Sequence, residues 1–173
     1  AVGVEKGDRF MDIGSGDGML VLAASMLFPH YLESSVGVEI VSELHDRSLT
    51  FQSRLEKILE NKNDGNIALC PSMGLDLGNV YEPNDRTAHL FSKTTLAVCF
   101  ATTWSRGLVG RKLSRLSEAL GTGGQCELPS GARLVTIDGV LDHSKDGYGY
   151  SGEFKLFCPD TTPFSIASLY TKL

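Results

Sequence analysis

A glycine-rich turn between an apolar strand and an apolar helix constrains the fold of this chain more than any other feature. Residues 10–18 read Phe-Met-Asp-Ile-Gly-Ser-Gly-Asp-Gly. Residues 9–13 form an expected first strand, and the almost wholly apolar residues 19–28 form an expected buried helix that ends at Pro29. Glycine lets backbone approach a ligand closely because no Cβ intervenes. The segment therefore predicts a ligand-binding turn between a strand and a helix.

Short apolar runs alternate with longer helical patterns along the chain. This alternation predicts an α/β fold with a mostly parallel sheet and helices on its faces. The expected strands are 9–13, 35–40, 66–70, 95–100, 132–138, 153–158 and 164–170, and the expected helices are 19–28, 42–62, 85–91 and 105–120. The last two strands are joined by a hairpin-sized link, so we expect them to be antiparallel neighbours.

Size, charge and cysteine usage exclude several classes of protein. The 173 residues are enough for one domain, so we expect residues 1–173 to form a single domain, cut from a longer chain because there is no starting Met. A net charge of −5 disfavours a basic nucleic-acid-binding domain. The four cysteines form no Cys-x-x-Cys pair, and no His, Cys, Asp or Glu set has metal-ligand spacing, so no metal is expected. Neither a membrane span nor a signal peptide is present, which favours an intracellular protein, cytoplasmic or nuclear, in a reducing compartment.

Acidic side chains in and beside the turn indicate the charge of its ligand. Asp12 precedes the first glycine by two residues, and Asp17 lies inside the turn. A nicotinamide-binding turn has the longer spacing Gly-x-Gly-x-x-Gly and places a pyrophosphate at the helix N-terminus, where two carboxylates would repel it. The acids instead suit a ligand with a cationic end, such as the amino group and sulfonium of S-adenosylmethionine (SAM). Glu39, which ends the second expected strand about 20 residues further on, can accept hydrogen bonds from both hydroxyls of a ribose.

With these features the chain resembles the class I SAM-dependent methyltransferases over nearly its whole length. Residues 12–18 match the first motif of that family, residues 38–40 (Val-Glu-Ile) match its second, and the closing antiparallel strand pair matches its sheet end. The resemblance implies a Rossmann-like three-layer sandwich. Its seven strands would have the order 3-2-1-4-5-7-6, with the last strand in the sequence antiparallel. It also implies methyl transfer from SAM.

The same resemblance implies a set of cofactor-binding residues. The methionine part of SAM would be held by Asp12 and by the backbone of Gly14, Ser15, Gly16, Asp17 and Gly18. Glu39 would bind the ribose, and Ile40 would pack on the adenine. Asp76 and Leu77, after the third expected strand, match the third motif, in which the acid accepts from the adenine amino group. An exposed loop acid is the alternative interpretation of Asp76. Phe100, at the end of the fourth expected strand, completes the set.

Within class I, the turn followed by Gly-Val-Glu-Ile at residues 37–40 is most similar to the non-SET histone lysine methyltransferases, the disruptor-of-telomeric-silencing family. That similarity implies a histone-like protein lysine as the favoured acceptor. The chain departs from this family after the fourth strand, where Phe-Ala-Thr-Thr-Trp at residues 100–104 replaces an Asn-Asn-Phe motif. A small-molecule or other protein-side-chain methyltransferase is one alternative. A non-catalytic module with the SAM-binding fold is another, and a nicotinamide-dependent oxidoreductase is disfavoured by the glycine spacing.

Candidate substrate residues follow the expected strands at their carboxyl ends, where ligands of such sheets bind. Thr102 and Thr103 could orient an incoming amine or cap the next helix, and Trp104, the only tryptophan, could wall a pocket or serve in packing. Tyr148 and Tyr150 lie in a glycine-rich stretch, residues 142–152, that is expected to be either an aromatic substrate lid or an exposed linker.

Basic residues give the expected helix at 105–120 a charged face. They are Arg106, Arg111, Lys112 and Arg115. A solvated helix face is the simpler interpretation, and an acidic protein partner is the alternative.

Overall fold

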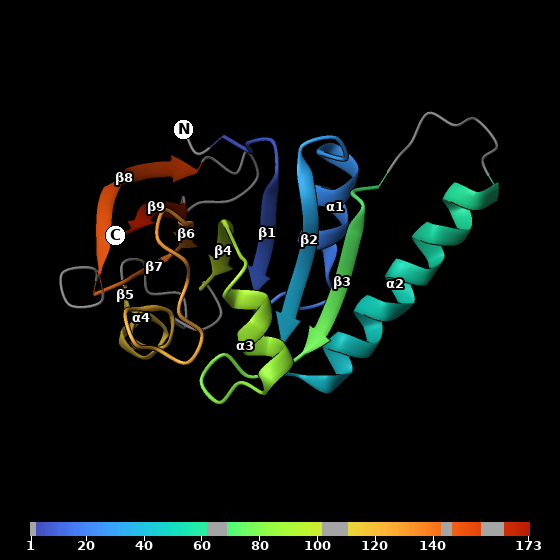
Figure 1. Cartoon of the computed structure of the whole chain (residues 1–173). Coiled ribbons are helices and arrows are strands. Elements are labelled where there is room, and N and C mark those ends of the chain that lie inside the picture. Colours follow the sequence, from blue (N-terminus) through green and yellow to red (C-terminus); the bar gives the residue numbers. More distant parts are fainter. Residues whose placement is uncertain (1–2, 62–68, 102–110, 143–146, 157–164) are drawn as a thin grey trace. The chain divides into compact units, whose positions relative to one another are not determined.

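The computed structural model describes residues 3–61, 69–101, 111–142, 147–156 and 165–173. Two compact units make up the described chain, Gly3–Asn79 and Val80–Leu173 (Figure 1).

The first unit is a parallel three-stranded sheet with two helices. Its elements are β1 (Asp8–Ile13), α1 (Met19–Leu27), β2 (Leu32–Glu39), α2 (Ser42–Asn61) and β3 (Ser72–Leu77). β2 lies between β1 and β3 and is parallel to both. The core is made of buried apolar side chains, among them Met11, Ile13 and Val21. α1 is bound to its surroundings through buried hydroxyls as well, since Ser35 Oγ donates to the Val21 carbonyl and Ser25 Oγ accepts from the Cys70 amide.

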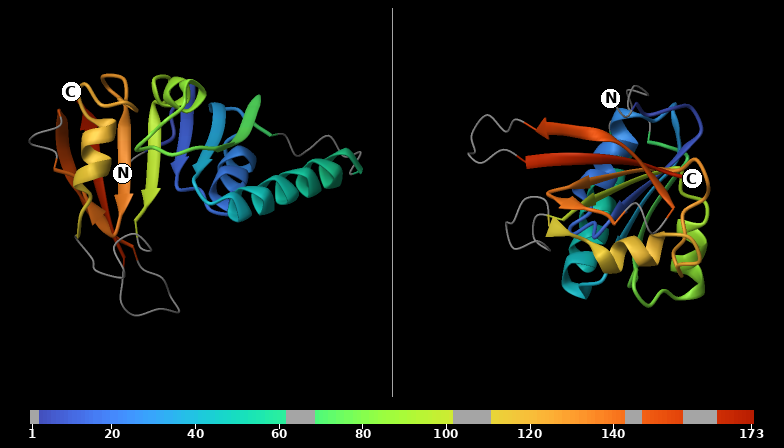
Figure 2. Two further views of the ribbon diagram at one scale, coloured as in Figure 1. Left: turned by 90° about the horizontal axis from the view of Figure 1, so that it is seen from below. Right: turned by 90° about the vertical axis from the view of Figure 1, so that its left-hand side faces the viewer.

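The second unit is built around an antiparallel end of the sheet (Figure 2). Its elements are α3 (Asp85–Phe91), β4 (Leu96–Phe100), β5 (Arg111–Lys112), α4 (Ser114–Leu120), β6 (Arg133–Ile137), β7 (Gly139–Val140), β8 (Tyr148–Leu156) and β9 (Ser165–Lys172). β4 is parallel to β6, whereas β9 is antiparallel to both β6 and β8. β5 and β7 form a separate two-stranded ladder. Asn84 caps α3 by accepting from the Thr87 amide at 2.8 Å.

The strand order of the seven-stranded sheet is β3-β2-β1-β4-β6-β9-β8. Numbered along the chain without the two short strands β5 and β7, this order is 3-2-1-4-5-7-6. β9, the last strand in the sequence, is the antiparallel one. The predicted fold class and strand order are therefore confirmed.

The third strand was predicted in the wrong place. β3 covers Ser72–Leu77 and pairs with β2 from Ser34 to Glu39, so residues 69 and 70 of the expected strand precede it. The rest of that expected strand lies outside the described residues. The apolar character of Cys70 was misleading because its amide is held by a helix side chain, Ser25 Oγ, instead of a neighbouring strand. β3 itself contains Gly74 and Asp76, two residue types that are depleted in strands.

The helix expected at residues 105–120 is described only from residue 111 on, and in that part it is helical only from Ser114. Arg111 and Lys112 form β5, which pairs with β7, and α4 begins only at Ser114. The Leu113 amide donates to the Val140 carbonyl, which ends the strand pairing directly before the helix. The basic helix face is therefore wrong for Arg111 and Lys112, while Arg106 lies outside the described residues. Arg115 does lie on α4, with its guanidinium carbon 4.5 Å from the centre of the Tyr81 ring.

Smaller boundary differences affect β2, which begins at Leu32, and β9, which ends at Lys172. The helix α3 has the predicted bounds, Asp85–Phe91.

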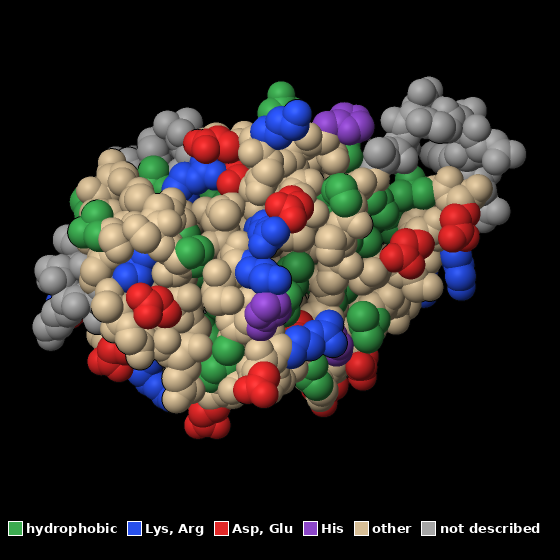
Figure 3. All heavy atoms as spheres, in the orientation of Figure 1, with side chains coloured by type: hydrophobic (Ala, Val, Ile, Leu, Met, Phe, Trp, Pro, Cys, Tyr) green, Lys and Arg blue, Asp and Glu red, His purple; other side chains and the backbone are tan. Residues whose placement is uncertain are grey.

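Three observations concern surface charge, membrane spans and metal binding. Lys and Arg side chains are interspersed with Asp and Glu on the face shown in Figure 3. Within the described ranges, no helix is long and apolar enough to cross a membrane, and no group of three or more His, Cys, Asp or Glu side chains is placed to hold a metal ion.

Candidate functional site

The turn after β1 has a backbone conformation that favours glycine at three positions. Gly14, Gly16 and Gly18 have φ angles of 74°, 56° and 78°. Residues that carry a Cβ rarely adopt these backbone angles, so the path of the backbone explains the spacing of the three glycines. Gly18 is also the N-cap of α1, and a Cβ there would lie 3.0 Å from atoms of Leu75 and Ser48.

Backbone amides of the turn donate to acceptors within the protein. The amides of Gly14 and Ser15 both donate to the Val38 carbonyl, at 2.8 and 3.1 Å, and that of Gly18 donates to the Ser15 carbonyl at 2.9 Å. The Gly16 amide donates to Glu39 Oε2 at 2.7 Å. A pyrophosphate-binding turn directs such amides to the ligand instead. These four amides are therefore not available to a pyrophosphate.

Asp12 is a buried acid at the end of β1, and its side chain is 3% exposed. No described residue donates a hydrogen bond to its carboxylate. Burial, and secondly the negative charge of Glu39, raise the pKa of Asp12 from 3.8 to about 7. A buried carboxylate without a donor is costly in its charged form, so a cationic group placed beside it would be bound strongly.

Glu39 ends β2 and is also buried, at 6% exposed. Its Oε1 accepts from the amides of Ile40 and Val41 at 2.9 and 2.8 Å, and its Oε2 accepts from Gly16. A carboxylate has about four acceptor positions. Three are used within the protein, so the expectation that Glu39 accepts from both ribose hydroxyls needs one of these bonds to break or be shared.

Asp17 is the second acid of the turn, and it has a cationic neighbour. Arg47 Nη2 on α2 lies 3.6 Å from Asp17 Oδ2, and both side chains are partly exposed. The negative charge of Asp17 is thus partly compensated by α2. The buried negative charge of the site comes from Asp12 and Glu39.

Two exposed apolar side chains lie where β2 and β3 end. Ile40, directly after β2, is 59% exposed, and Leu77, the last residue of β3, is 47% exposed. Glu39 and Leu77 are register partners, and the Gly78 amide donates to the Glu39 carbonyl. An apolar surface therefore borders the Glu39 carboxylate.

Asp76 lies inside β3 and not after it, and it is buried at 5% exposed. It pairs with Val38, which pairs with Ile13, whereas Asp12 pairs with Gly37. Because successive strand residues point to opposite faces, Asp76 lies on the sheet face opposite to Asp12 and Glu39. The interpretation of Asp76 as an exposed loop acid is wrong. The register does not bring it together with the two other acids.

Gly37 is a site residue that was not recognised from the sequence. A Cβ at this position would lie 2.6 Å from Ser15 Cβ and Oγ and 2.8 Å from Val21 Cγ2. The missing side chain allows the turn and α1 to lie directly on β2, with Ser15 buried at 8% exposed. The signal in the sequence is a glycine inside an apolar strand, two residues before Glu39, which is typical of close backbone approach.

Phe100, the last of the predicted cofactor-binding residues, ends β4 and is 46% exposed. Thr102, Thr103 and Trp104 lie outside the described residues.

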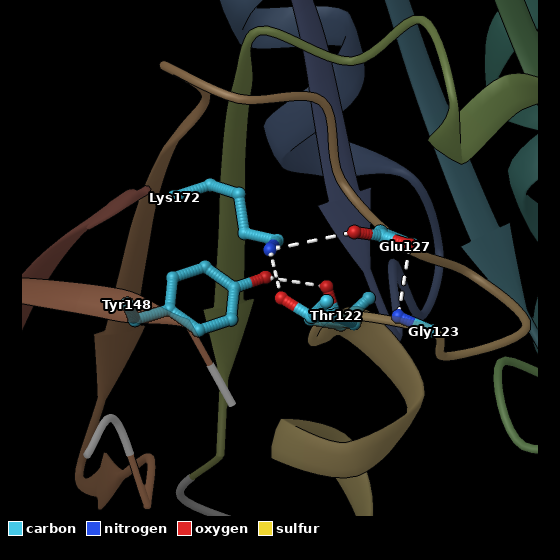
Figure 4. A network of polar contacts seen from close by, with 6 residues as sticks. Thr122, Gly123, Glu127, Tyr148 and Lys172 are labelled. Atoms are coloured by element: carbon cyan, nitrogen blue, oxygen red, sulfur yellow. Dashed lines mark hydrogen bonds and ion pairs between the residues drawn. The ribbon is translucent and has the colours of Figure 1, made fainter. Parts of the chain in front are cut away.

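Tyr148 and Tyr150 lie in β8 and not in a loop. Figure 4 shows Tyr148 together with Thr122 and Lys172. Tyr148 is 3% exposed, and its hydroxyl donates to the Leu120 carbonyl at 2.7 Å. The buried ammonium of Lys172 lies 5.7 Å from the centre of the Tyr148 ring. Tyr150 is 45% exposed and packs at 5.7 Å against Tyr170. The lid and linker interpretations are wrong for these two residues, because pairing with β9 holds residues 148–150 in the sheet.

The ammonium of Lys172 has partners of its own in this network. It donates to Thr122 Oγ1 at 2.7 Å and lies 3.4 Å from Glu127 Oε1. Glu127 Oε2 accepts from the Gly123 amide. The network joins β9 to the segment after α4, which gives Tyr148 a packing role.

Tyr148→Phe is expected to lower the free energy of unfolding by about 1 kcal/mol, because it removes a buried hydrogen bond. The loss is modest because the Leu120 carbonyl also accepts from the Leu128 amide. Urea denaturation measures it, with Tyr31→Phe, at an exposed tyrosine, as the control. A lid residue would show no change in stability, and that result would contradict the packing role.

Comparisons with known proteins concern the fold. No protein-family model matches this chain, and no curated protein matches it in sequence. Sp1610 from Streptococcus pneumoniae, a candidate tRNA (m1A22) methyltransferase, is 13% identical with a TM-score of 0.59, over 98% of this chain and 65% of that one. Magnesium protoporphyrin IX methyltransferase from Synechocystis PCC 6803, solved with bound SAH (S-adenosylhomocysteine), is 10% identical with a TM-score of 0.55, over 97% and 75%. An rRNA methylase from Streptococcus thermophilus is 11% identical with a TM-score of 0.56, over 98% and 91%.

This chain spans 65% of the length of Sp1610, and it spans 56% and 45% of the length of two further similar structures. The similar structures do not support the narrower resemblance to histone lysine methyltransferases, because those described here are named for tRNA, rRNA and a porphyrin. Strand order and structural similarity together show that the chain has the Rossmann-like fold of the class I SAM-dependent methyltransferases.

Proposed function

We propose that this protein binds SAM at the turn after β1 and transfers its methyl group to a nucleophilic acceptor. The observation that carries the proposal is the buried Asp12 carboxylate, to which no described residue donates a hydrogen bond. In the turn beside it, four backbone amides donate to acceptors within the protein, those of Gly14, Ser15, Gly16 and Gly18. This arrangement favours a cationic ligand over an anionic one. The sulfonium and amino group of SAM supply such charge, and one solved structure with this fold contains SAM.

Each residue of the site has a proposed role. The Asp12 carboxylate attracts the cationic methionine end, and the Gly14–Gly18 backbone shapes the space beside it. Glu39 accepts from the ribose through the acceptor position that remains on Oε2. Ile40 and Leu77 offer exposed apolar surface to the adenine. Asp76 is not part of this proposal, because it lies on the opposite face of the sheet.

The chemistry asks little of the protein beyond alignment and exclusion of water. SAM supplies an activated methyl group, so the acceptor lone pair forms the new bond while the electron pair of the breaking carbon–sulfur bond stays on sulfur. An amine acceptor must lose a proton, which a desolvated channel favours by lowering the amine pKa. Phe100, Thr102, Thr103 and Trp104 are proposed to border the acceptor, at the end of β4 and after it.

Calorimetric titration of the purified protein with SAM and SAH tests the cofactor. We expect a dissociation constant in the micromolar range for SAM, which corresponds to a binding free energy on the order of −8 kcal/mol. NADH, titrated in the same way, is the control ligand and is expected not to bind. Binding of NADH without binding of SAM by folded protein would contradict the proposal.

The identity of the methyl acceptor is a separate proposal, and three chemical classes of acceptor are compared. A histone-like protein lysine is favoured by the similarity of residues 12–18 and 37–40 to the non-SET histone lysine methyltransferases. RNA and small molecules are the acceptors named for the similar solved structures. Transfer of radiolabelled methyl to histones, to RNA and to small amines under identical conditions distinguishes them. SAM binding without transfer to any acceptor would favour a non-catalytic binding module.

A further inference from the structure

The Glu39 carboxylate connects two parts of the site that are distant in sequence. Its Oε1 is used within its own strand end, by the amides of Ile40 and Val41. Its Oε2 crosses to the turn after β1 and accepts from the Gly16 amide at 2.7 Å. This distance is typical of a strong, charge-assisted hydrogen bond. Three backbone amides thus share one buried carboxylate.

Gly16 is the position of the turn where such support matters most. Its φ of 56° lies in the left-handed region, and a Cβ there would meet nothing within 4 Å. The neighbouring glycines are anchored differently, since the Gly14 amide binds the Val38 carbonyl and Gly18 packs near Leu75. The Glu39 carboxylate is therefore the acceptor that anchors the middle of the turn.

We propose that Glu39 is a positioning residue for the glycine turn, which it holds in its binding conformation before any ligand arrives. The second half of the inference rests on the proposed function. A ribose hydroxyl binds the remaining acceptor position of Oε2, so the Gly16 bond persists in the SAM complex. Glu39 would then couple the ribose end of the ligand to the turn at its methionine end through one carboxylate.

Glu39→Gln separates this role from a general role in stability. The glutamine oxygen can still accept from the amides of Ile40 and Val41, but its NH2 group then faces the Gly16 amide, and two donors cannot form a hydrogen bond. Amide hydrogen exchange followed by NMR in ligand-free protein is the measurement. We expect exchange at Gly16 to accelerate at least about tenfold. Exchange at Ile40 and Val41 should change much less.

Glu33→Gln is the matched control, because Glu33 lies on the same strand and its carboxylate pairs with the partly exposed Arg9. This variant is expected to leave exchange at Gly16 unchanged. Equal acceleration at Gly16, Ile40 and Val41 in Glu39→Gln would overturn the positioning role, because it would indicate general loosening of the strand end. Rapid exchange at Gly16 in the wild-type protein would also overturn it, and this test holds even if Glu39→Gln does not fold.

The ligand half is tested by the same amide in the presence of SAM. We expect Gly16 to stay protected in the wild-type complex and the dissociation constant for SAM to rise at least about tenfold in Glu39→Gln. Loss of Gly16 protection on SAM binding would overturn the single-acceptor arrangement. A protected Gly16 in ligand-free protein that binds neither SAM nor SAH would overturn the proposed function, while the positioning role would stand.

Discussion

Asp12→Asn is expected to weaken SAM binding at least tenfold and, at the same time, to stabilise the ligand-free protein above pH 7. The Asp12 pKa is raised from 3.8 to about 7, so between these values the folded protein holds a proton that the unfolded chain has lost. Stability therefore falls as the pH rises through this window. Because one pKa unit corresponds to 1.36 kcal/mol, the free energy of unfolding falls by up to about 4 kcal/mol by pH 8. Asparagine has no charge to bury and avoids that loss.

Urea denaturation at pH 5 and pH 8 measures the effect. Between pH 5 and pH 8, the free energy of unfolding is expected to fall more in the wild-type protein than in Asp12→Asn. Asp46→Asn, at an exposed acid on α2, is the control. The affinity of the wild-type protein for SAM should rise with pH through about 7, because the ionised carboxylate attracts the cation. Equal pH dependence of stability in wild-type and Asp12→Asn protein would refute the assignment of a buried, proton-holding Asp12.

Gly37→Ala is expected to destabilise the first unit by about 1–3 kcal/mol and to weaken SAM binding, because it forces the turn away from β2. The new Cβ would lie 2.6 Å from Ser15 Cβ, a distance that requires a shift of the turn or of α1. In a strand without such a neighbour, alanine in place of glycine would stabilise the protein by roughly 0.4–1 kcal/mol.

Gly74→Ala is the matched control for this prediction. Gly74 lies in β3 of the same sheet, and a Cβ there meets nothing within 4 Å. Urea denaturation of both variants, followed by calorimetry with SAM, is the measurement. If the two variants have the same stability, the close approach of Ser15 to Gly37 is not a packing constraint.

The glycine turn could be predicted because its signal is local in the sequence, whereas the strand order was implied by the resemblance to the class I SAM-dependent methyltransferases. A strand, a turn with three glycines and an apolar helix follow one another within 20 residues, Asp8–Leu27 in the structure. The short link before β9 allows only an antiparallel neighbour. Composition of neighbouring residues was a poorer guide for β3, where Gly74 and Asp76 interrupt the strand pattern.

Roles that depend on contacts between distant residues could not be predicted in this way. Tyr148 lies in a glycine-rich stretch, which is typical of a loop, but its hydroxyl donates to the Leu120 carbonyl and its strand pairs with β9. Asp76 matched a motif in sequence, yet the register of β2 and β3 places it on the face opposite to Asp12.

The sequence by itself determined the fold class and the position of the glycine turn, because strand and helix periodicity and backbone conformation are set by nearby residues. The strand order followed from the resemblance to a known family. Only the tertiary structure decided how the acids of the site are used. Asp12 has a pKa raised to about 7 because packing buries it beside Glu39. Glu39 has one acceptor position left because folding brings the Gly16 amide, 23 residues earlier, to its carboxylate.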